Sequence, residues 1–169
     1  MSQPIRIGKS FAYAFWILFL VMGVYVFDGF LSQKHNPNQS PDTYAVGNEQ
    51  VLVLKQNRMG HYVASGFINN YPVTFLLDTG ATNVAIPKHV ADAIGLPYGA
   101  PFRANTANGI ATGYRTEIDS LAISDFQFGR VSASILPGMK DDEILLGMSA
   151  LKRVEFTQRG DTLTLKSMF

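Results

Sequence analysis

An uncharged apolar run near the N-terminus divides this chain into two unlike parts. The seventeen residues from Phe11 to Phe27 contain no Asp, Glu, Lys or Arg. As a helix, this run would be about 25 Å long, slightly short of a ~30 Å hydrocarbon core, and Phe30 and Leu31 extend it. It lacks the polar stripe of a helix that packs on a soluble core. We therefore predict a membrane anchor over residues 11–31.

The charges beside the run predict which side of the membrane each part occupies. Arg6 and Lys9 precede the run, whereas Asp28 follows it and the next cation is Lys34. By the positive-inside rule, residues 1–10 stay in the cytoplasm and the rest is exported. In a bacterium, this is a single pass through the inner membrane with the folded part in the periplasm. A cleaved signal peptide is the alternative, although the run does not end in the small residues typical of a cleavage site.

The segment after the run has the composition of a linker. Residues 32–50 contain Pro37, Pro41 and several Asn and Ser residues, with little regular apolar spacing. A folded domain is then expected over residues 51–169, about 120 residues, which is enough for one domain.

Charge and residue content exclude several functions. A net charge of +1 does not provide the basic surface that nucleic-acid binding needs, so no nucleic-acid partner is expected. The chain has no cysteine, which rules out disulfides, thiolate nucleophiles and cysteine zinc sites. The three histidines show no paired metal-ligand spacing, and we expect no metal and no cofactor.

Short apolar segments between Gly, Asn and Asp residues predict an all-β domain. Hairpin turns are expected at Asn69-Asn70 and, more strongly, at Asn108-Gly109. Short helices are expected at residues 87–94, which Gly95 would end, and at residues 149–153. The predicted strands are residues 51–54, 61–68, 71–77, 84–86, 102–107, 110–121, 122–123, 126–128, 131–136, 144–146, 154–157 and 162–165.

One tetrapeptide, Asp78-Thr79-Gly80-Ala81, is the strongest candidate for chemistry. It follows the apolar strand of residues 73–77, and a carboxylate there is costly unless it is hydrogen-bonded or solvated in a cleft. Asp and Gly are also ordinary turn residues, so the tetrapeptide alone is weak support for a site. About seventy residues later, a second apolar strand, Ile144-Leu145-Leu146, ends in Gly147.

The order of these motifs resembles the retropepsin-like aspartic proteases. Strand-Asp78-Thr79-Gly80-Ala81, a glycine-bearing hairpin at Asn108-Gly109, and an apolar-apolar-Gly run before a short helix follow one another in that family's order. The resemblance covers residues 51–169 and is closest to the membrane-anchored bacterial single-domain members. It implies a closed retropepsin-like β-barrel with a flap hairpin and one or two short helices.

The resemblance also implies roles for individual residues. Asp78 would be the catalytic aspartate, supported by hydrogen bonds of Thr79 below the paired aspartates. Gly80 would contact the substrate backbone and Ala81 would line the floor of the site. Leu146 and Gly147 would support the Asp78 strand. The flap over a bound peptide would be formed by Ala107, Asn108, Gly109 and Ile110.

The chemistry of this family requires two carboxylates that share one proton, because like charges about 3 Å apart do not both ionise cheaply. The chain has a single Asp-Thr-Gly, since Asp161-Thr162 continues with Leu163. An active enzyme must therefore be a homodimer with one Asp78 from each copy, and its substrate would be a peptide or protein. Two alternatives remain: a non-catalytic peptide-binding or adaptor module on the same fold, and an enzyme that dimerises only when a partner gathers it.

Two positions depart from the viral members of the family. These have an acidic residue after Asp-Thr-Gly-Ala and an Arg after the later Gly, which form an ion-pair network near the dimer interface. Here Thr82 and Met148 occupy those positions. Both partners are absent together, so no buried charge is left unpaired, and the dimer contacts must come from elsewhere.

Overall fold

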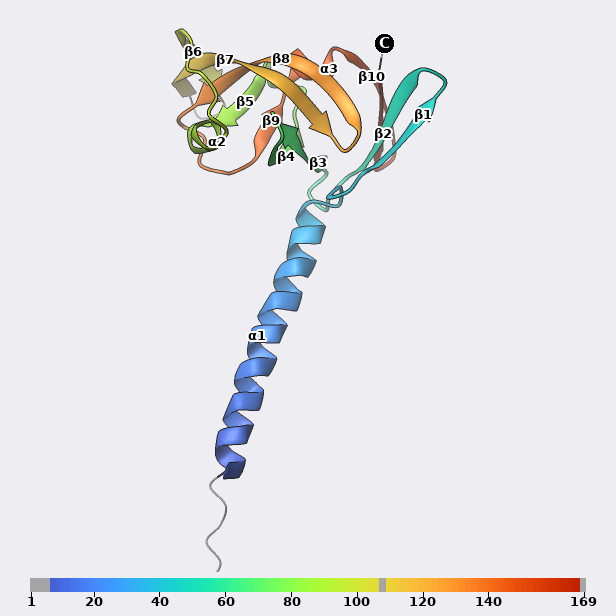
Figure 1. Cartoon of the computed structure of the whole chain (residues 1–169). Helices are drawn as coiled ribbons and strands as arrows, with labels where there is room; N and C mark the ends of the chain where they lie inside the picture. The colour runs from blue at the N-terminus through green and yellow to red at the C-terminus, as the bar shows by residue number, and fades with distance from the viewer. Residues whose placement is uncertain (1–6, 107–108, 168–169) are drawn as a thin grey trace, which may run out of the picture. The chain divides into compact units, whose positions relative to one another are not determined.

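The chain divides between His35 and Asn36 into an N-terminal helix and a β domain, which are described separately (Figure 1). The computed structural model describes residues 7–106 and 109–167.

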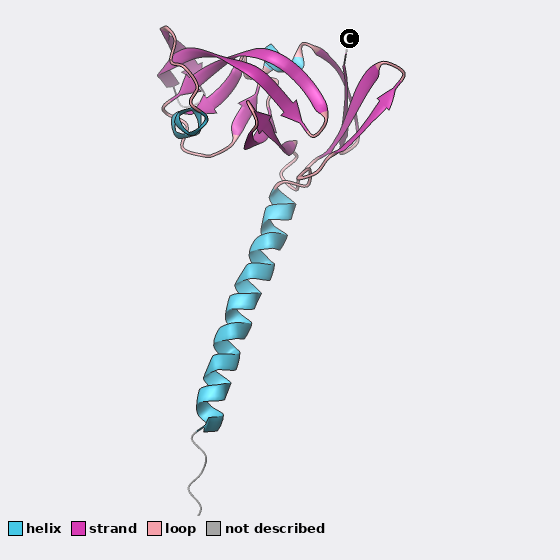
Figure 2. Ribbon diagram, viewed as in Figure 1, coloured by secondary structure: helices cyan, strands magenta, loops and turns pink. Residues whose placement is uncertain are grey.

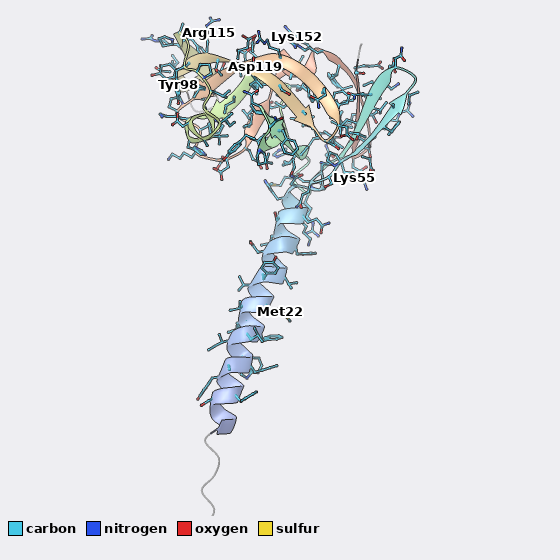
Figure 3. The ribbon with its side chains drawn as sticks, in the orientation of Figure 1. Met22, Lys55, Tyr98, Arg115, Asp119 and Lys152 are labelled. Carbon is cyan, nitrogen blue, oxygen red and sulfur yellow. The ribbon has the colours of Figure 1, made fainter. Side chains whose placement is uncertain are left out.

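The first unit is one long helix, α1 (Ile7–His35). Its segment Ser10–His35 is long and apolar enough to cross a membrane, and the most apolar window of this segment is 0% buried among the described residues. Its side chains, Met22 among them, project outward (Figure 3). The prediction of an apolar N-terminal helix is confirmed, and such a helix has the properties of either a membrane anchor or a signal sequence.

The β domain contains two sheets (Figure 2). The smaller sheet is antiparallel, and its four strands lie in the order β1 (Asp42–Val46), β2 (Glu49–Lys55), β11 (Thr162–Ser167) and β10 (Val154–Arg159). The larger sheet has seven strands in the order β3 (Val63–Ile68), β4 (Tyr71–Leu77), β9 (Ile144–Leu146), β5 (Val84–Pro87), β8 (Phe126–Leu136), β7 (Gly109–Ile123) and β6 (Pro101–Thr106).

Two short helices complete the domain, α2 (Lys88–Ile94) and α3 (Met148–Leu151). Helix α2 ends as expected at Gly95, whose φ of 78° is the left-handed conformation that glycine adopts without strain. The mostly β class with short helices is confirmed. β3 also pairs with β7 over two residue pairs, but closure of the sheet into a barrel stays a prediction.

Both sheets contribute to one hydrophobic core. Leu52 and Leu165 of the smaller sheet belong to the same buried cluster as Phe75, Ile118 and Ile135 of the larger one. Burying a side chain of this size stabilises the fold by about 1.5–3 kcal/mol. The core therefore fixes the strands that lead into and out of the Asp78 loop.

Two predicted strand breaks are absent. The segments predicted separately at residues 110–121 and 122–123 form one strand, β7, and those at residues 126–128 and 131–136 form β8. Leu121 pairs with Gly129 where the register between β7 and β8 shifts, and Gly129 has a φ of 70°. A β-bulge of this kind lets a strand continue across a glycine that the sequence presents as a break.

The structure differs from the expected linker over residues 32–50. Helix α1 continues to His35, and residues 42–46 form strand β1, which pairs with β2. Asn38 is 3% exposed, and its backbone carbonyl accepts a hydrogen bond from the Ser65 amide at 3.0 Å. The absence of regular apolar spacing wrongly indicated a linker, because amide side chains rather than apolar ones attach this segment to the domain.

The Asn38 side chain forms hydrogen bonds with the backbones of β2 and β3. Its Nδ2 donates to the carbonyls of Lys55 at 2.9 Å and Val63 at 2.7 Å, and its Oδ1 accepts from the Lys55 amide at 2.7 Å. The Oδ1 of Asn36 accepts from the Asn38 amide at 2.9 Å. Every hydrogen-bonding group of this buried side chain is thus engaged.

Asn38→Ala is expected to lower the free energy of unfolding by roughly 2–3 kcal/mol, because it leaves backbone groups of β2 and β3 without partners. Urea unfolding of the full chain in detergent measures this change. Asn48→Ala, at the exposed turn between β1 and β2, is the matched control and should stay within about 0.5 kcal/mol of wild type. Equal losses in the two variants would contradict the role given to Asn38.

Candidate active site

The Asp78 loop leaves β4 at Leu77 and enters β5 at Val84. Strand β9 lies between these two strands, parallel to β4 and antiparallel to β5. Leu77 pairs with Leu146, so the end of β9 lies beside the start of the loop. Two segments about seventy residues apart in sequence are therefore adjacent, as the sequence interpretation required.

Asp78 organises the first turn of the loop. Its amide donates to the carbonyl of Leu146 at 3.2 Å, and its side-chain Oδ1 accepts the amide of Gly80 at 2.8 Å. The Ala81 amide donates to the Asp78 carbonyl at 3.2 Å. A Cβ on Gly80 would lie only 3.1 Å from that same Oδ1, so glycine suits this close approach. The carboxylate itself is partly exposed and can meet a ligand.

Gly147 lies against the back of the loop. A Cβ built there would be 2.2 Å from the Asn83 carbonyl oxygen and 2.6 Å from that of Ala81. The amide of Met148 donates to the Ala81 carbonyl at 2.8 Å, and the amide of Ser149 donates to the Thr82 carbonyl at 3.0 Å. Leu146 and Gly147 are thus in contact with the Asp78 loop.

Buried polar side chains beneath the loop were not identified from the sequence. Ser149 is 7% exposed; its Oγ accepts the Val84 amide at 3.0 Å and donates to the Ser132 carbonyl at 2.8 Å. Asn83 Nδ2 donates to the Oγ of Ser134, which is 4% exposed, at 3.3 Å. Serines next to apolar residues carry no pattern of their own, so only their position in the fold makes them identifiable.

The outer surface of the loop is exposed in this single chain. Thr79, Gly80 and Thr82 are exposed, and Ala81 is partly buried. Met148, where the viral proteins have Arg, instead packs its side chain partly against the hydrophobic core. Backbone hydrogen bonds from Met148 and Ser149, rather than an ion pair, hold this part of the loop.

The hairpin predicted as a flap is formed by β6 and β7, with Thr106 paired to Gly109. Ala107 and Asn108 lie outside the described residues. Gly109 has a φ of 107°, which favours glycine, and Ile110 is 71% exposed near the turn. The hairpin prediction is confirmed, whereas the action of its tip on a substrate stays a prediction.

Within residues 7–106 and 109–167, no group of three or more His, Asp or Glu side chains has the geometry to hold a metal ion. What the described loop offers chemically is a partly exposed carboxylate on a turn held by backbone hydrogen bonds. Such a carboxylate can act as a general base or acid toward a bound group.

Comparisons with known proteins agree with this geometry. The sequence profile of the family described as "gag-polyprotein putative aspartyl protease" matches residues 64–153, just over half of the chain. That match includes the Asp78 loop, the hairpin and Gly147.

Two curated relatives are both described as uncharacterized. One, from the cobV 5' region of a Sinorhizobium species, is 32% identical over 122 residues, 70% of this chain and 52% of the relative. The other, from Rickettsia prowazekii (strain Madrid E), is 29% identical over 107 residues, 60% of this chain and 45% of the relative. The chain thus spans about half the length of the curated relatives it matches.

A solved structure extends the similarity to three dimensions. The crystal structure of a retropepsin-like aspartic protease from Rickettsia conorii superposes with a TM-score of 0.57 at 27% sequence identity. The alignment covers 75% of this chain and 94% of that protein. Together with the family profile, it shows that this chain belongs to the retropepsin-like family of aspartyl proteases.

Proposed function

We propose that this protein is a membrane-anchored aspartic endopeptidase that acts as a homodimer and cuts extended peptides. The observation that carries the proposal is the Asp78 turn, in which Gly80 and Leu146 hold the aspartate by the hydrogen bonds described above. Family membership supports the reaction class, and the partly exposed carboxylate supports Asp78 as the catalytic residue.

In the proposed reaction, the Asp78 carboxylates of two copies share one proton. The ionised member takes a proton from a water molecule, which attacks the carbonyl carbon of the peptide bond. The protonated member donates to the oxygen on which negative charge develops. Proton transfer to the amine then lets the carbon–nitrogen bond break. Thr79, Gly80 and Ala81 would support the pair and contact the substrate backbone.

A homodimer is supported by what a single chain lacks and what it leaves exposed. The chain supplies one Asp-Thr-Gly, and Thr79 and Gly80 beside it are exposed. In the smaller sheet, the outer strands β1 and β10 each pair with one strand among those described. An outer strand with a free edge can pair with a second copy of the chain.

Strand β10 is the better suited of these two edges. Antiparallel pairing of two copies about Thr157 would put Glu155 of each copy opposite Arg159 of the other, and opposite charges at facing positions stabilise a sheet. The five residues of β1, from Asp42 to Val46, contain one charged side chain, so two copies of this strand could not form such a pair of opposite charges.

We also propose that α1 anchors the chain in the inner membrane, with residues 1–10 in the cytoplasm and the β domain in the periplasm. The cations Arg6 and Lys9 before the apolar run support this orientation. Confinement to a membrane raises the effective concentration of the copies and favours dimers. A substrate would bind as an extended strand beneath the β6–β7 hairpin, with Gly109 and Ile110 near its turn.

Dilution tests the proposed dimer. Full-length protein in detergent, assayed on a peptide library over a range of pH, should cleave, and its activity per chain should rise with protein concentration until dimers saturate. Sedimentation measures the dimer population at the same concentrations. Cleavage with a constant activity per chain, in samples that sediment as monomers, would contradict the shared site. No cleavage at any concentration or pH would favour the binding-module alternative.

A further inference from the structure

We propose that the hydroxyl of Ser149 is a positioning group for the reaction, because it holds the far end of the Asp78 loop. The inference rests on the proposed function, since it concerns the aspartate pair of that site. Ser149 does not touch the reacting atoms in this proposal and acts through Val84 and the loop that ends there.

The Ser149 hydroxyl both donates and accepts a hydrogen bond inside the protein. It has one proton, donated to the Ser132 carbonyl at 2.8 Å, and it accepts the Val84 amide at 3.0 Å. Its backbone amide donates to the Thr82 carbonyl at 3.0 Å. With 7% of the residue exposed, these bonds are largely shielded from competing water. The orientation of the hydroxyl is therefore fixed by the fold.

These bonds connect three segments that are distant in sequence. Ser149 lies in α3, Val84 begins β5 at the end of the Asp78 loop, and Ser132 lies in β8. Val84 is 0% exposed, so its amide would be a buried donor without its partner if the hydroxyl were removed. The start of the loop is held separately by the bond from the Asp78 amide to the Leu146 carbonyl. Ser149 thus holds the end of the loop at Val84, next to the pairing of Ala85 with Leu145 of β9.

In a two-fold dimer, a shift of the loop acts twice. Each copy moves its own Asp78, so the separation of the two carboxylates changes by the sum of both movements. A displacement of about 1 Å at a reacting group costs roughly 10²-fold in rate. Sharing of a proton also depends on the separation of the two carboxylates, so a looser pair interacts less strongly.

Ser149→Ala tests the proposal in the full chain. We expect kcat to fall roughly 10- to 100-fold, with KM within about twofold of wild type, since the peptide-binding surface is unchanged. The acidic and basic limbs of the pH–rate profile should move toward each other as the carboxylates separate. Ser149→Thr keeps a hydroxyl at this position and should retain most of the wild-type kcat.

Ile118→Val is the control for a general loss of stability. Ile118 is 0% exposed on β7, where it pairs with Val131 rather than with the loop. It should lower the thermal midpoint without changing kcat or the pH–rate profile. The proposal is wrong if Ser149→Ala loses activity only in proportion to its unfolded fraction, as Ile118→Val would.

Amide hydrogen exchange provides a readout that does not depend on cleavage. Exchange of residues 78–84 should be faster in Ser149→Ala than in wild type, and unchanged in Ile118→Val. Equal exchange in all three proteins would overturn the positioning role. If wild-type protein cleaves nothing, the proposed function fails and the catalytic part of this inference fails with it, while the exchange result still decides whether Ser149 holds the loop.

Discussion

Asp78→Asn is expected to abolish peptide cleavage, lowering kcat by roughly 10³-fold or more, while the fold and the dimer are retained. Asparagine has nearly the shape of aspartate, and its carbonyl oxygen can still accept the Gly80 amide that Oδ1 of Asp78 accepts at 2.8 Å. It neither takes a proton from water nor shares one with the second copy. Cleavage kinetics and sedimentation of the full-length variant measure the two expectations.

Asp161→Asn is the matched control for this result. Asp161 is also followed by threonine, but it lies in the turn between β10 and β11 and has Leu163 where Asp78 has Gly80. Its substitution should leave kcat within about twofold of wild type. Substantial cleavage by a folded, dimeric Asp78→Asn protein would contradict the assignment of Asp78 and the mechanism built on it.

Mixing the two proteins tests the shared site directly. If each active dimer needs one Asp78 from each of its two copies, an excess of Asp78→Asn protein should draw wild-type chains into mixed dimers and suppress their activity. Activity that stays proportional to the wild-type protein present would show that a copy works without its partner's aspartate.

Gly147→Ala is expected to cause the largest loss of stability of any single methyl addition near the loop, roughly 3 kcal/mol. The added Cβ would lie 2.2 Å from one backbone carbonyl oxygen and 2.6 Å from another, and backbone cannot rotate away as a side chain does. The φ of Gly147 is −89°, which any residue adopts, so the requirement is steric rather than conformational. Guanidinium unfolding of the full chain measures the loss.

Gly138→Ala separates this contact from the general effect of removing a glycine. A Cβ at Gly138 would meet nothing within 4 Å, and this glycine is not among those with a positive φ. Its unfolding free energy should stay within about 0.5 kcal/mol of wild type. If Gly147→Ala were equally harmless, the packing of Gly147 against the Asp78 loop would be wrong.

Local patterns predicted most of the strands that carry the site. Tyr71 to Leu77 and Ile144 to Leu146 have the predicted bounds, because each is an apolar run followed at once by a turn residue. The β6–β7 hairpin was predicted from the Asn-Gly turn sequence, because the turn preference of these two residues does not depend on distant partners. The proximity of Asp78 and Gly147 followed from the family resemblance and is confirmed by the pairing of Leu77 with Leu146.

Features that depend on distant partners were missed. Strand β1 is mostly exposed and lacks a buried face of its own, so its residues resemble a linker until β2 is placed beside them. Asn38 and Ser149 are polar residues whose partners are 17 to 65 residues away in sequence. Their burial follows from tertiary hydrogen bonds, which a pattern of local hydrophobicity does not record.

The attachment of Asn36 and Asn38 to the β domain limits how the domain can be shed from α1. A processing protease needs several consecutive residues in an extended, accessible form, and here exposed Gln39 and Ser40 are flanked by buried Asn38 and by partly buried Pro41. Cutting this stretch would require the Asn38 hydrogen bonds to open first. Cleavage of this stretch would then depend on the population of that locally opened form as well as on the processing enzyme.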